Sequence, residues 1–273
     1  MACAIAFLCL AAPVQGAPTA SSSVVGGGGA APGSLPSTVS IKIGSGLCSG
    51  SVVSPTTVVT AAHCLRKTPV SQMFVRANTT SSFAGGEIIG VTAAVPHPNF
   101  KLGFAGIIND IAILKLAVPT TATPIALPTA EEDATLTPPG ASLQIAGFGR
   151  SNPNLNKPAR VGTLLTAPVF TRTACRGSSY RSFSTETMVC ASGPAFVVAQ
   201  SGRKKRAVQR ATCFGDSGGP LLANTATGPR LIGVTSYGGI YPNNFAFVAC
   251  GLKGFPDVYT RVAAFLPFIQ PYL

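Results

Sequence analysis

A serine among glycines is the residue whose setting best suits nucleophilic chemistry. Ser217 lies in the string G-D-S-G-G-P at 215–220, where small neighbours let the backbone approach a reacting carbonyl and present N–H donors to a developing oxyanion. A hydroxyl becomes a nucleophile near neutral pH only when a base takes its proton, and histidine has a suitable pKa. The string therefore predicts covalent catalysis at Ser217, provided that a histidine lies beside it.

The chain has two histidines, His63 and His97, and both precede Ser217. The string also matches G-x-S-x-G, the nucleophile elbow of α/β-hydrolases, in which the histidine follows the serine. Chain order excludes that interpretation. His63 follows the β-branched run 57–61 and adjoins Cys64, whereas His97 lies between two prolines in a predicted turn. We expect His63 to be the base and His97 to be structural.

A catalytic histidine needs a buried carboxylate that fixes its tautomer and stabilises the imidazolium. Asp110 stands out among eight acidic residues because it precedes the strongly apolar run 111–116. On this local pattern alone, a surface aspartate at the start of a strand is the simpler interpretation. Asp110 is therefore a candidate that needs a second line of support.

The elements that must position these residues are short strands. The chain has 30 glycines and 23 prolines, which argue against long helices. Short β-branched runs separated by turn residues predict an all-β sandwich or barrels. These runs are 39–43, 51–53, 57–61, 87–95, 111–116, 142–146, 161–169, 231–236 and 258–262. Residues 120–139 are typical of an exposed connector between two halves, and 262–273 is the one segment expected to form a helix, limited in length by two prolines.

Composition narrows the class of function. The 273 residues carry a formal net charge of +12, which could indicate a nucleic-acid partner. Five of the positive charges lie within 203–210, however, and the rest of the chain has no basic stripe interleaved with aromatic residues. We therefore expect no nucleic acid among its partners.

The first residues are typical of a signal peptide. Residues 1–23 contain no charged side chain and open with an apolar run too short to span a bilayer. We expect cleavage after Gly16, so that 1–16 is the signal peptide and 17–23 a short propeptide. The alternative is an uncleaved anchor at the membrane surface. With the signal removed, the protein is expected to be secreted and free of the membrane.

Removal of 1–16 leaves an even number of cysteines, which in a secreted chain suggests disulfides, although many pairings are possible. They are Cys48, Cys64, Cys175, Cys190, Cys213 and Cys250. No C-x-x-C pair occurs, and with only two histidines we expect no zinc site. No metal and no cofactor are expected.

Several strings, in this order, resemble the chymotrypsin/trypsin family of serine proteases. They are V-V-G-G at 24–27, T-A-A-H-C at 60–64, N-D-I-A-I-L-K-L at 109–116, A-G-F-G at 146–149, G-D-S-G-G-P at 215–220 and P-D-V-Y-T-R-V at 256–262. The resemblance spans 24–273 and implies an all-β, trypsin-like fold of two antiparallel six-stranded β-barrels with a short C-terminal helix. The barrels would cover about 24–130 and 131–261, the helix 262–273, and the active site would lie between the barrels.

The resemblance assigns roles to the candidate residues. It makes Ser217 the nucleophile, His63 the general base and then the general acid, and Asp110 the residue that orients His63. Gly215 and Ser217 would supply the oxyanion-hole amides. The implied disulfides are Cys48–Cys64, Cys175–Cys190 and Cys213–Cys250.

Activation is implied by the same resemblance. Release of the Val24 amine would let its ammonium group pair with Asp216 and order the oxyanion loop. Ser23 precedes Val24, so a trypsin-like enzyme could not cut there. We expect a dipeptidyl or other peptidase to trim 17–23.

The specificity pocket departs from that of trypsins. The substrate-binding residues implied by the resemblance are Ala211, Thr212, Phe214, Ser236, Tyr237, Gly238 and Asp257. In trypsins an aspartate six residues before the nucleophile binds the substrate Lys or Arg, and that position here is Ala211. Asp257 replaces a glycine usual in the family and would bring a carboxylate in from the opposite wall. Because a buried unpaired charge is costly, we expect cleavage after Arg or Lys with broad tolerance, unless Asp257 turns away to pair with Lys253.

The expected function is that of a secreted serine endopeptidase that hydrolyses peptide bonds through an acyl-enzyme. It would act as a monomer on protein or peptide substrates and could be bound by protein protease inhibitors. The alternative is a catalytically inactive homologue that acts as a binding or inhibitory protein. Such homologues usually lack a triad residue, and here all three are in place.

Other departures concern surface loops. Glu87 is the only carboxylate between Phe74 and Val95, the stretch of the family's calcium loop, so no calcium site is expected. The same stretch holds the only N-glycosylation sequon, at Asn78. Insertions at 191–212 and 239–249 flank the pocket. The first carries the basic cluster 203–206, which we expect to be either a solvated loop or an autolysis site, with polyanion binding as a weaker alternative.

Overall fold

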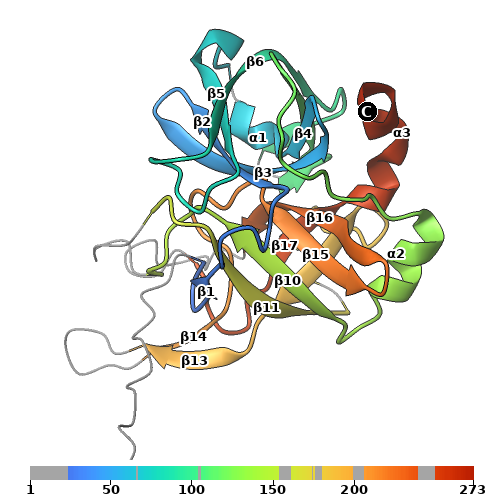
Figure 1. The fold of residues 1–273 in the computed structure, drawn as a ribbon. Helices are drawn as coiled ribbons and strands as arrows, with labels where there is room; N and C mark the ends of the chain where they lie inside the picture. The colour runs from blue at the N-terminus through green and yellow to red at the C-terminus, as the bar shows by residue number, and fades with distance from the viewer. Residues whose placement is uncertain are drawn as a thin grey trace, which may run out of the picture.

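Antiparallel strands close into two six-stranded barrels, the first in the upper half and the second in the lower half of Figure 1. The computed structural model describes residues 24–65, 67–103, 106–153, 161–173, 175, 180–198, 206–238 and 250–273. The expected all-β fold of two barrels with a short C-terminal helix is confirmed. The expected signal peptide 1–16 and propeptide 17–23, residues 203–205 of the basic cluster and the insertion 239–249 lie outside the described residues.

The strands of each barrel follow a simple order. The first barrel consists of β2 (Thr38–Ile43), β3 (Gly46–Ser54), β4 (Thr57–Thr60), β9 (Ala112–Leu116), β6 (Glu87–Pro96) and β5 (Met73–Ala77). The second consists of β11 (Leu165–Thr171), β10 (Ser142–Gly147), β15 (Pro220–Thr225), β16 (Gly228–Gly238), β17 (Asp257–Arg261) and β12 (Met188–Ser192), closed by pairing of β12 with β11. All nine expected runs fall within or overlap these strands, while β5, β12 and β15 were not expected.

Shorter elements lie outside the barrels. The hairpins are β7 (Lys101–Gly103) with β8 (Gly106–Ile108), and β13 (Ala195–Val198) with β14 (Arg206–Gln209). The helices are α1 (Ala62–Leu65), α2 (Ala130–Leu136) and α3 (Leu266–Ile269), the last flanked by single 3-10 turns. Within the described ranges no helix is long and apolar enough to cross a membrane.

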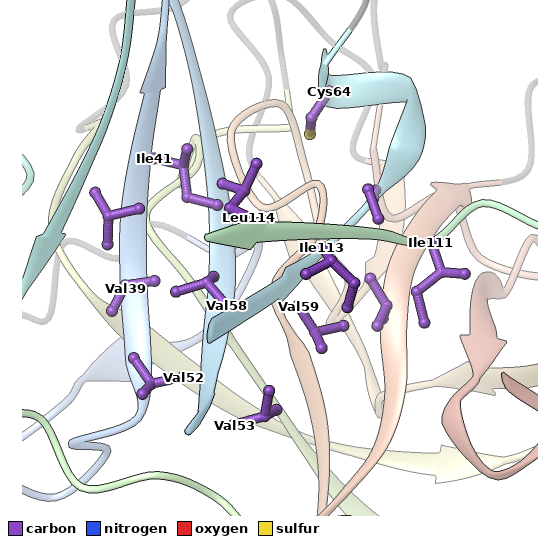
Figure 2. Packing of buried hydrophobic residues seen from close by; sticks show 14 of the residues in the cluster. Val39, Ile41, Val52, Val53, Val58, Val59, Cys64, Ile111, Ile113 and Leu114 are labelled. Carbon is purple, nitrogen blue, oxygen red and sulfur yellow. The ribbon is translucent and has the colours of Figure 1, made fainter. Parts of the chain in front are cut away.

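The interior of the first barrel is filled by alternate side chains of its strands (Figure 2). In β2, the apolar Val39, Ile41 and Ile43 alternate with polar residues along the strand, and Lys42 is the one exposed residue of the six. β4 and β9 contribute Val59 and Ile113 to the same core. His63 follows the end of β4 and Asp110 precedes the start of β9, so barrel packing fixes the position of the segments that carry them.

Each end of the chain packs on the barrel that is farther along the chain from it. Val24 belongs to the core of the second barrel, and β1 (Gly28–Gly29) pairs with β11. At the other end, Phe265 and Ile269 belong to a buried cluster that consists mainly of first-barrel residues and also includes Leu222, Leu231 and Val234 of the second. The segment 24–130 was expected to form the first barrel, but its first residues pair with a strand of the second barrel.

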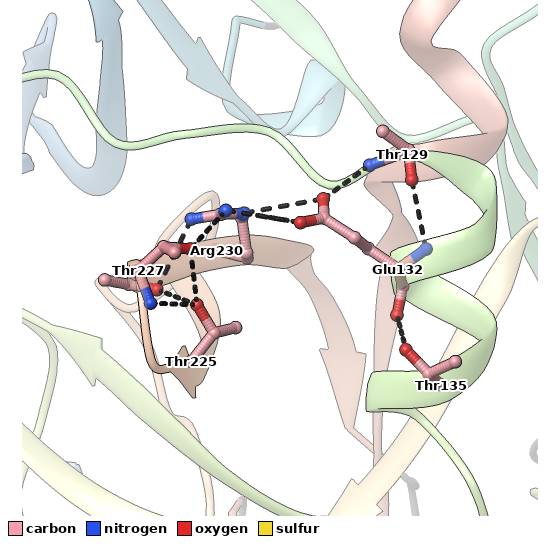
Figure 3. A network of polar contacts seen from close by, with 7 residues as sticks. Thr129, Glu132, Thr135, Thr225, Thr227 and Arg230 are labelled. Atoms are coloured by element: carbon pink, nitrogen blue, oxygen red, sulfur yellow. Dashed lines mark hydrogen bonds and ion pairs between the residues drawn. The ribbon is translucent and has the colours of Figure 1, made fainter.

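The connector expected at 120–139 contains a helix that was not expected, α2. Thr129 caps this helix: its hydroxyl accepts from the backbone N–H of Glu132, and the Glu132 carboxylate accepts from the backbone N–H of Thr129 (Figure 3). This capping box stabilises a short helix by about 1 kcal/mol. Glu132 also pairs with Arg230 of β16 at 3.2 Å, which joins the connector to the second barrel.

Candidate active site

A cavity of about 760 Å³ is lined by residues of both barrels. His63 reaches it from the first barrel and Ser217 from the second, and the disulfide Cys48–Cys64 borders it. Of the predicted substrate-binding residues, Thr212, Phe214, Ser236, Tyr237, Gly238 and Asp257 line it as well. Ala211 does not line the cavity: it is buried, and its backbone pairs with Val25. His97 does not line it either, and its ring packs edge-on against Phe268.

The local geometry of the chain fixes the position of His63. It lies in the single-turn helix α1 directly after β4, and the neighbouring Cys64 is bonded to Cys48 of β3. The backbone N–H of His63 donates to Oδ1 of Asp110 at 2.9 Å, and its Nδ1 lies 2.7 Å from Oδ2. Because an ionised carboxylate can only accept, Nδ1 carries the proton and Nε2 is left as an acceptor. The arrangement fixes both the tautomer and the direction of the ring.

Asp110 is only 1% exposed, so the alternative of a surface aspartate at the start of a strand was wrong. Asn109 before it adopts φ 51°, a left-handed conformation that asparagine tolerates and that turns the chain into β9. Besides His63, Oδ2 accepts from the hydroxyl of Ser236 at 2.5 Å, and the backbone carbonyl accepts from Thr260 at 2.8 Å. Two residues of the second barrel thus hold Asp110 of the first, one at its carboxylate and one at its backbone.

The turn around Ser217 depends on glycine. Gly215 and Gly218 have φ of 98° and 80°, which side chains disfavour. A Cβ at Gly218 would lie 2.1 Å from the hydroxyl oxygen of Thr60, so the close approach of the two barrels excludes any larger residue there. The Ser217 carbonyl accepts from the N–H of Ser49 at 2.8 Å, which joins this turn to β3.

Two backbone donors at this turn remain available. Within the part of the chain that the structure describes, no hydrogen bond uses the N–H of Gly215 or Ser217. The carbonyl of Phe214 accepts from the N–H of Arg150 at 2.8 Å. Since the C=O and N–H of a trans peptide point in opposite directions, the N–H of Gly215 points away from Arg150. This orientation suits donation to an oxyanion.

Asp216 is fully buried behind the turn. Its carboxylate accepts from the N–H groups of Gly149 and Cys213, both at 2.8 Å. Burial raises the pKa of Asp216 to about 7, and the two hydrogen bonds lower it. A Cβ at Gly147 or Gly149 would lie within 2.6 Å of Asp216 atoms, which explains glycine at both positions. No cationic group among the described residues pairs with it.

Asp257 is also buried at the cavity wall. Its Oδ2 accepts from the backbone N–H of Thr212 at 2.6 Å and from the Thr212 hydroxyl at 2.9 Å. Burial raises its pKa to about 7, while these hydrogen bonds lower it. The described ion pairs do not include one with Lys253, which is exposed. Asp257 therefore does not turn away to Lys253.

The three disulfides have the pairing that the resemblance implied, and two of them border the cavity. They are Cys48–Cys64, Cys175–Cys190 and Cys213–Cys250. The first borders the part of the cavity near His63, and the third borders the part near Asp257. Within the described ranges no group of three or more His, Cys, Asp or Glu residues is placed to hold a metal ion.

Glu87 organises the loop before β6 through hydrogen bonds. Its carboxylate accepts from the side chains of Asn78, Thr120 and Thr121 and from the N–H of Thr121. The hydrogen bond from the Thr121 hydroxyl is the main reason that its pKa falls to about 2. Asn78 is exposed and has φ 54°. Its glycosylation stays a prediction.

Replacing Glu87 with glutamine is expected to lower the free energy of unfolding by about 1 kcal/mol near neutral pH, because one accepting oxygen becomes a donor. The pKa is lower in the folded protein than in the unfolded chain. The carboxylate therefore stabilises the fold above pH 4.5, and this effect is lost as the pH falls towards 2. Thermal unfolding across this range should show the two proteins converge in acid. Glu186→Gln, at an exposed glutamate, is the control; an equal loss there would contradict the prediction.

Comparison with known proteins agrees with this geometry. The Trypsin family matches residues 24–269. Trypsin alpha-4 of Lucilia cuprina is 31% identical over 270 residues, covering 96% of this chain and 92% of that protein. Phenoloxidase-activating factor 3 of Holotrichia diomphalia is 30% identical over 82% of this chain, and Serine protease 56 of Homo sapiens is 32% identical over 90% of it. The matches span 63% and 38% of those two longer proteins. Since the family match includes both barrels, the chain belongs to the trypsin family of serine proteases.

Proposed function

We propose that the protein is a secreted serine endopeptidase that hydrolyses peptide bonds through an acyl-enzyme. One observation carries the proposal. Asp110, buried between the barrels, binds both the backbone N–H and Nδ1 of His63, and His63 shares a cavity with Ser217. A buried carboxylate that binds both groups fixes the position and the tautomer of this histidine, as a catalytic base requires. The inactive-homologue alternative has no observation in its favour.

The roles follow from the donors and acceptors. Nε2 of His63 accepts the proton of Ser217 as the hydroxyl attacks the substrate carbonyl, and Asp110 stabilises the resulting imidazolium. The N–H groups of Gly215 and Ser217 donate to the oxyanion of the tetrahedral intermediate. His63 then gives its proton to the leaving amine. In the second half of the reaction, water attacks the acyl-enzyme while His63 accepts its proton, and His63 returns this proton to Ser217 as the acid product leaves.

An active-site-directed reagent tests the proposal. The protein beginning at Val24 should react with an alkyl fluorophosphonate or a sulfonyl fluoride, and peptide mapping should find the adduct on Ser217. The reaction requires the activated hydroxyl, so the exposed Ser34 should stay unmodified. Failure to label Ser217, under conditions that label an active trypsin-family enzyme, would favour an inactive homologue.

Activation is proposed to follow release of the Val24 amine. Val24 is fully buried and has φ 51°, a strained conformation for a β-branched residue. Asp216 is buried with two backbone donors, and a cationic group would complete its environment. We expect a protein starting at Val24 to be active and one that retains Ser23 to have much lower kcat/KM. Amino-terminal sequencing of the active form should give Val24, and active material that starts elsewhere would contradict the proposal.

The preferred residue before the cleaved bond, P1, is proposed to be Arg or Lys, with tolerance of apolar residues. Asp257 supports this as a buried carboxylate at the cavity wall, and Gly238 beside it has no side chain to cover it. Secretion through residues 1–16 and action as a monomer on protein or peptide substrates, with protein protease inhibitors as further partners, belong to the same proposal.

Preference for basic residues should increase with pH. Asp257 has a raised pKa of about 7, so it is mostly neutral below that pH and charged above it. A cationic P1 side chain is attracted only by the charged form of Asp257. We expect the ratio of kcat/KM for a Lys substrate to that for a matched Leu substrate to rise between pH 6 and pH 8, because any pH effect on the catalytic groups is common to both substrates and cancels in the ratio. Asp257→Asn should give a lower, flat ratio; a native ratio independent of pH would contradict this.

A further inference from the structure

The hairpin of β13 and β14 packs on the first described residues of the chain. A Cβ at Gly26 would lie 2.5 Å from the ring of Phe196 in β13, so the ring lies directly on the Gly26 backbone. Phe196 is half-buried. Gly26 also has φ 72°, a conformation that side chains disfavour. The ring therefore covers backbone that only a glycine can present to it.

The residue that follows β14 adds polar contacts to the same segment. Nε of Arg210 donates to the Gly26 carbonyl at 3.0 Å. Beside it, the N–H of Val25 donates to the Ala211 carbonyl at 3.0 Å, and the N–H of Ala211 donates to the Val25 carbonyl at 3.3 Å. Residues 24–27 are therefore held by a side-chain hydrogen bond, a backbone bridge and an aromatic contact.

The base of the hairpin is anchored to the second barrel. The N–H of Gly193, directly after β12, donates to the Arg210 carbonyl at 2.9 Å. The N–H of Gln209 donates to the Gly251 carbonyl at 2.7 Å, next to the disulfide-bonded Cys250. The hairpin thus holds residues 24–27 from a fixed position.

The held segment is connected to the catalytic turn through residues 210–213. Cys213 is disulfide-bonded, its N–H donates to the Asp216 carboxylate at 2.8 Å, and its carbonyl accepts from the N–H of Asp216 at 2.9 Å. In the proposed activation, the same carboxylate receives the ammonium group of Val24. Release of the segment would leave this buried carboxylate without its cation, which is costly.

We propose that the β13–β14 hairpin is a clamp that holds the mature amino-terminal segment in place. Phe196 and Arg210 are its positioning residues, and they act through Val24 on the turn around Ser217. The inference rests on the proposed activation by the Val24 amine. It adds that the insertion 191–212 controls how often residues 24–27 are released.

Reaction of the Val24 amine with cyanate measures this release. An α-amine has a lower pKa than a lysine amine, so more of it is unprotonated and reactive near neutral pH. Val24 is fully buried, so its amine reacts only when the segment is released. In protein that begins at Val24, we expect Phe196→Ala to be modified at this amine about 10-fold faster than the native protein, because apolar contact is lost. Mass spectrometry of the amino-terminal peptide measures the rate, and peptide hydrolysis should be lost at the same rate.

Three further variants assign the effect to the clamp. Arg210→Met removes the Nε donor but keeps an apolar stem, and it should speed modification about 5-fold. Phe196→Leu keeps an apolar side chain and should react more slowly than Phe196→Ala. Phe74→Ala, at an exposed phenylalanine of the first barrel, should react at the native rate. The exposed Lys253 checks that all samples meet equal reagent. Modification of Phe74→Ala as fast as that of Phe196→Ala would overturn the inference.

Denaturant separates release of the segment from unfolding of the whole protein. Release of a few residues exposes little surface, so the modification rate of Phe196→Ala should hardly change at low guanidinium chloride concentrations. Global unfolding exposes far more surface and gives a steep increase. A steep increase from the lowest concentrations would show that Phe196 only stabilises the fold, and it would overturn the inference.

The cyanate rates distinguish failure of the clamp from failure of the proposed function. Equal protection of Val24 in the native protein and in Phe196→Ala would overturn the inference and leave the activation standing. A native amine that reacts as fast as that of a synthetic peptide of residues 24–29 would overturn the inference together with the activation. Faster reaction in Phe196→Ala would support the clamp even if neither protein hydrolysed peptides, a result that would count only against the proposed hydrolase.

Discussion

Ser217→Ala is expected to lower kcat for peptide hydrolysis by about four to six orders of magnitude, since loss of one member of such a triad removes the covalent route as a whole. The fold should be unaffected, because the turn is held by backbone contacts, including that from the N–H of Ser49 to the Ser217 carbonyl. Single-turnover and steady-state assays on protein purified away from other proteases measure the effect.

Ser34→Ala is the matched control, because Ser34 is exposed and its hydroxyl bonds only to the nearby Ala31 carbonyl. It should retain native activity. Hydrolysis by pure Ser217→Ala at the native rate would show that Ser217 is not the nucleophile, and the covalent mechanism would have to be abandoned.

Asp110→Asn is expected to lower kcat about 10⁴-fold at neutral pH. Asparagine keeps the shape but presents an NH₂ group towards Nδ1 of His63 or loses the contact with its backbone N–H, because one amide cannot accept at both positions. The histidine then favours the tautomer with a proton on Nε2, which cannot accept from Ser217.

An acid-to-amide substitution at an exposed residue distinguishes loss of the catalytic role from a mere change of net charge. Glu131→Gln changes the net charge equally and lies on the surface of α2, so it should have native kcat. Comparable losses in the two variants would indicate a general electrostatic effect and remove the special role of Asp110. Circular dichroism of both variants shows whether the fold is retained.

Sequence patterns predicted strands in which apolar and polar residues alternate regularly. They missed strands in which this alternation cannot be seen in the sequence. β2 alternates and was expected. In β5 the exposed positions include Phe74, which is 42% exposed, so the apolar run shows no clear period. β12 is buried throughout and too short to distinguish from other apolar segments. The helix α2 could have been expected from Thr129 and Glu132, whose spacing is that of a capping box.

The candidate active site, like the fold, was only partly predictable from local sequence patterns. The setting of Ser217 was visible in its own string because glycine is a local requirement. The burial of Asp110 was not visible in the sequence, because the residues that bind it from the second barrel, Ser236 and Thr260, are 126 and 150 residues away in the chain. For Asp257, the sequence offered Lys253 as a near neighbour, whereas the fold supplies Thr212, 45 residues away. Contacts of this range are set by barrel packing, which no local pattern records.

The exchanged ends of the chain make unfolding of the two barrels interdependent. Phe265 and Ile269 follow the second barrel but fill the core of the first, and Val24 precedes the first but fills the core of the second. Lys115 of β9 also donates to the Tyr272 carbonyl at 2.9 Å, which ties the last turn to the first barrel. Each buried cluster therefore includes side chains from a segment that lies, in sequence, beyond the other barrel. Loss of one core therefore withdraws apolar contacts from the other, and the two halves of the cleft melt as one cooperative unit.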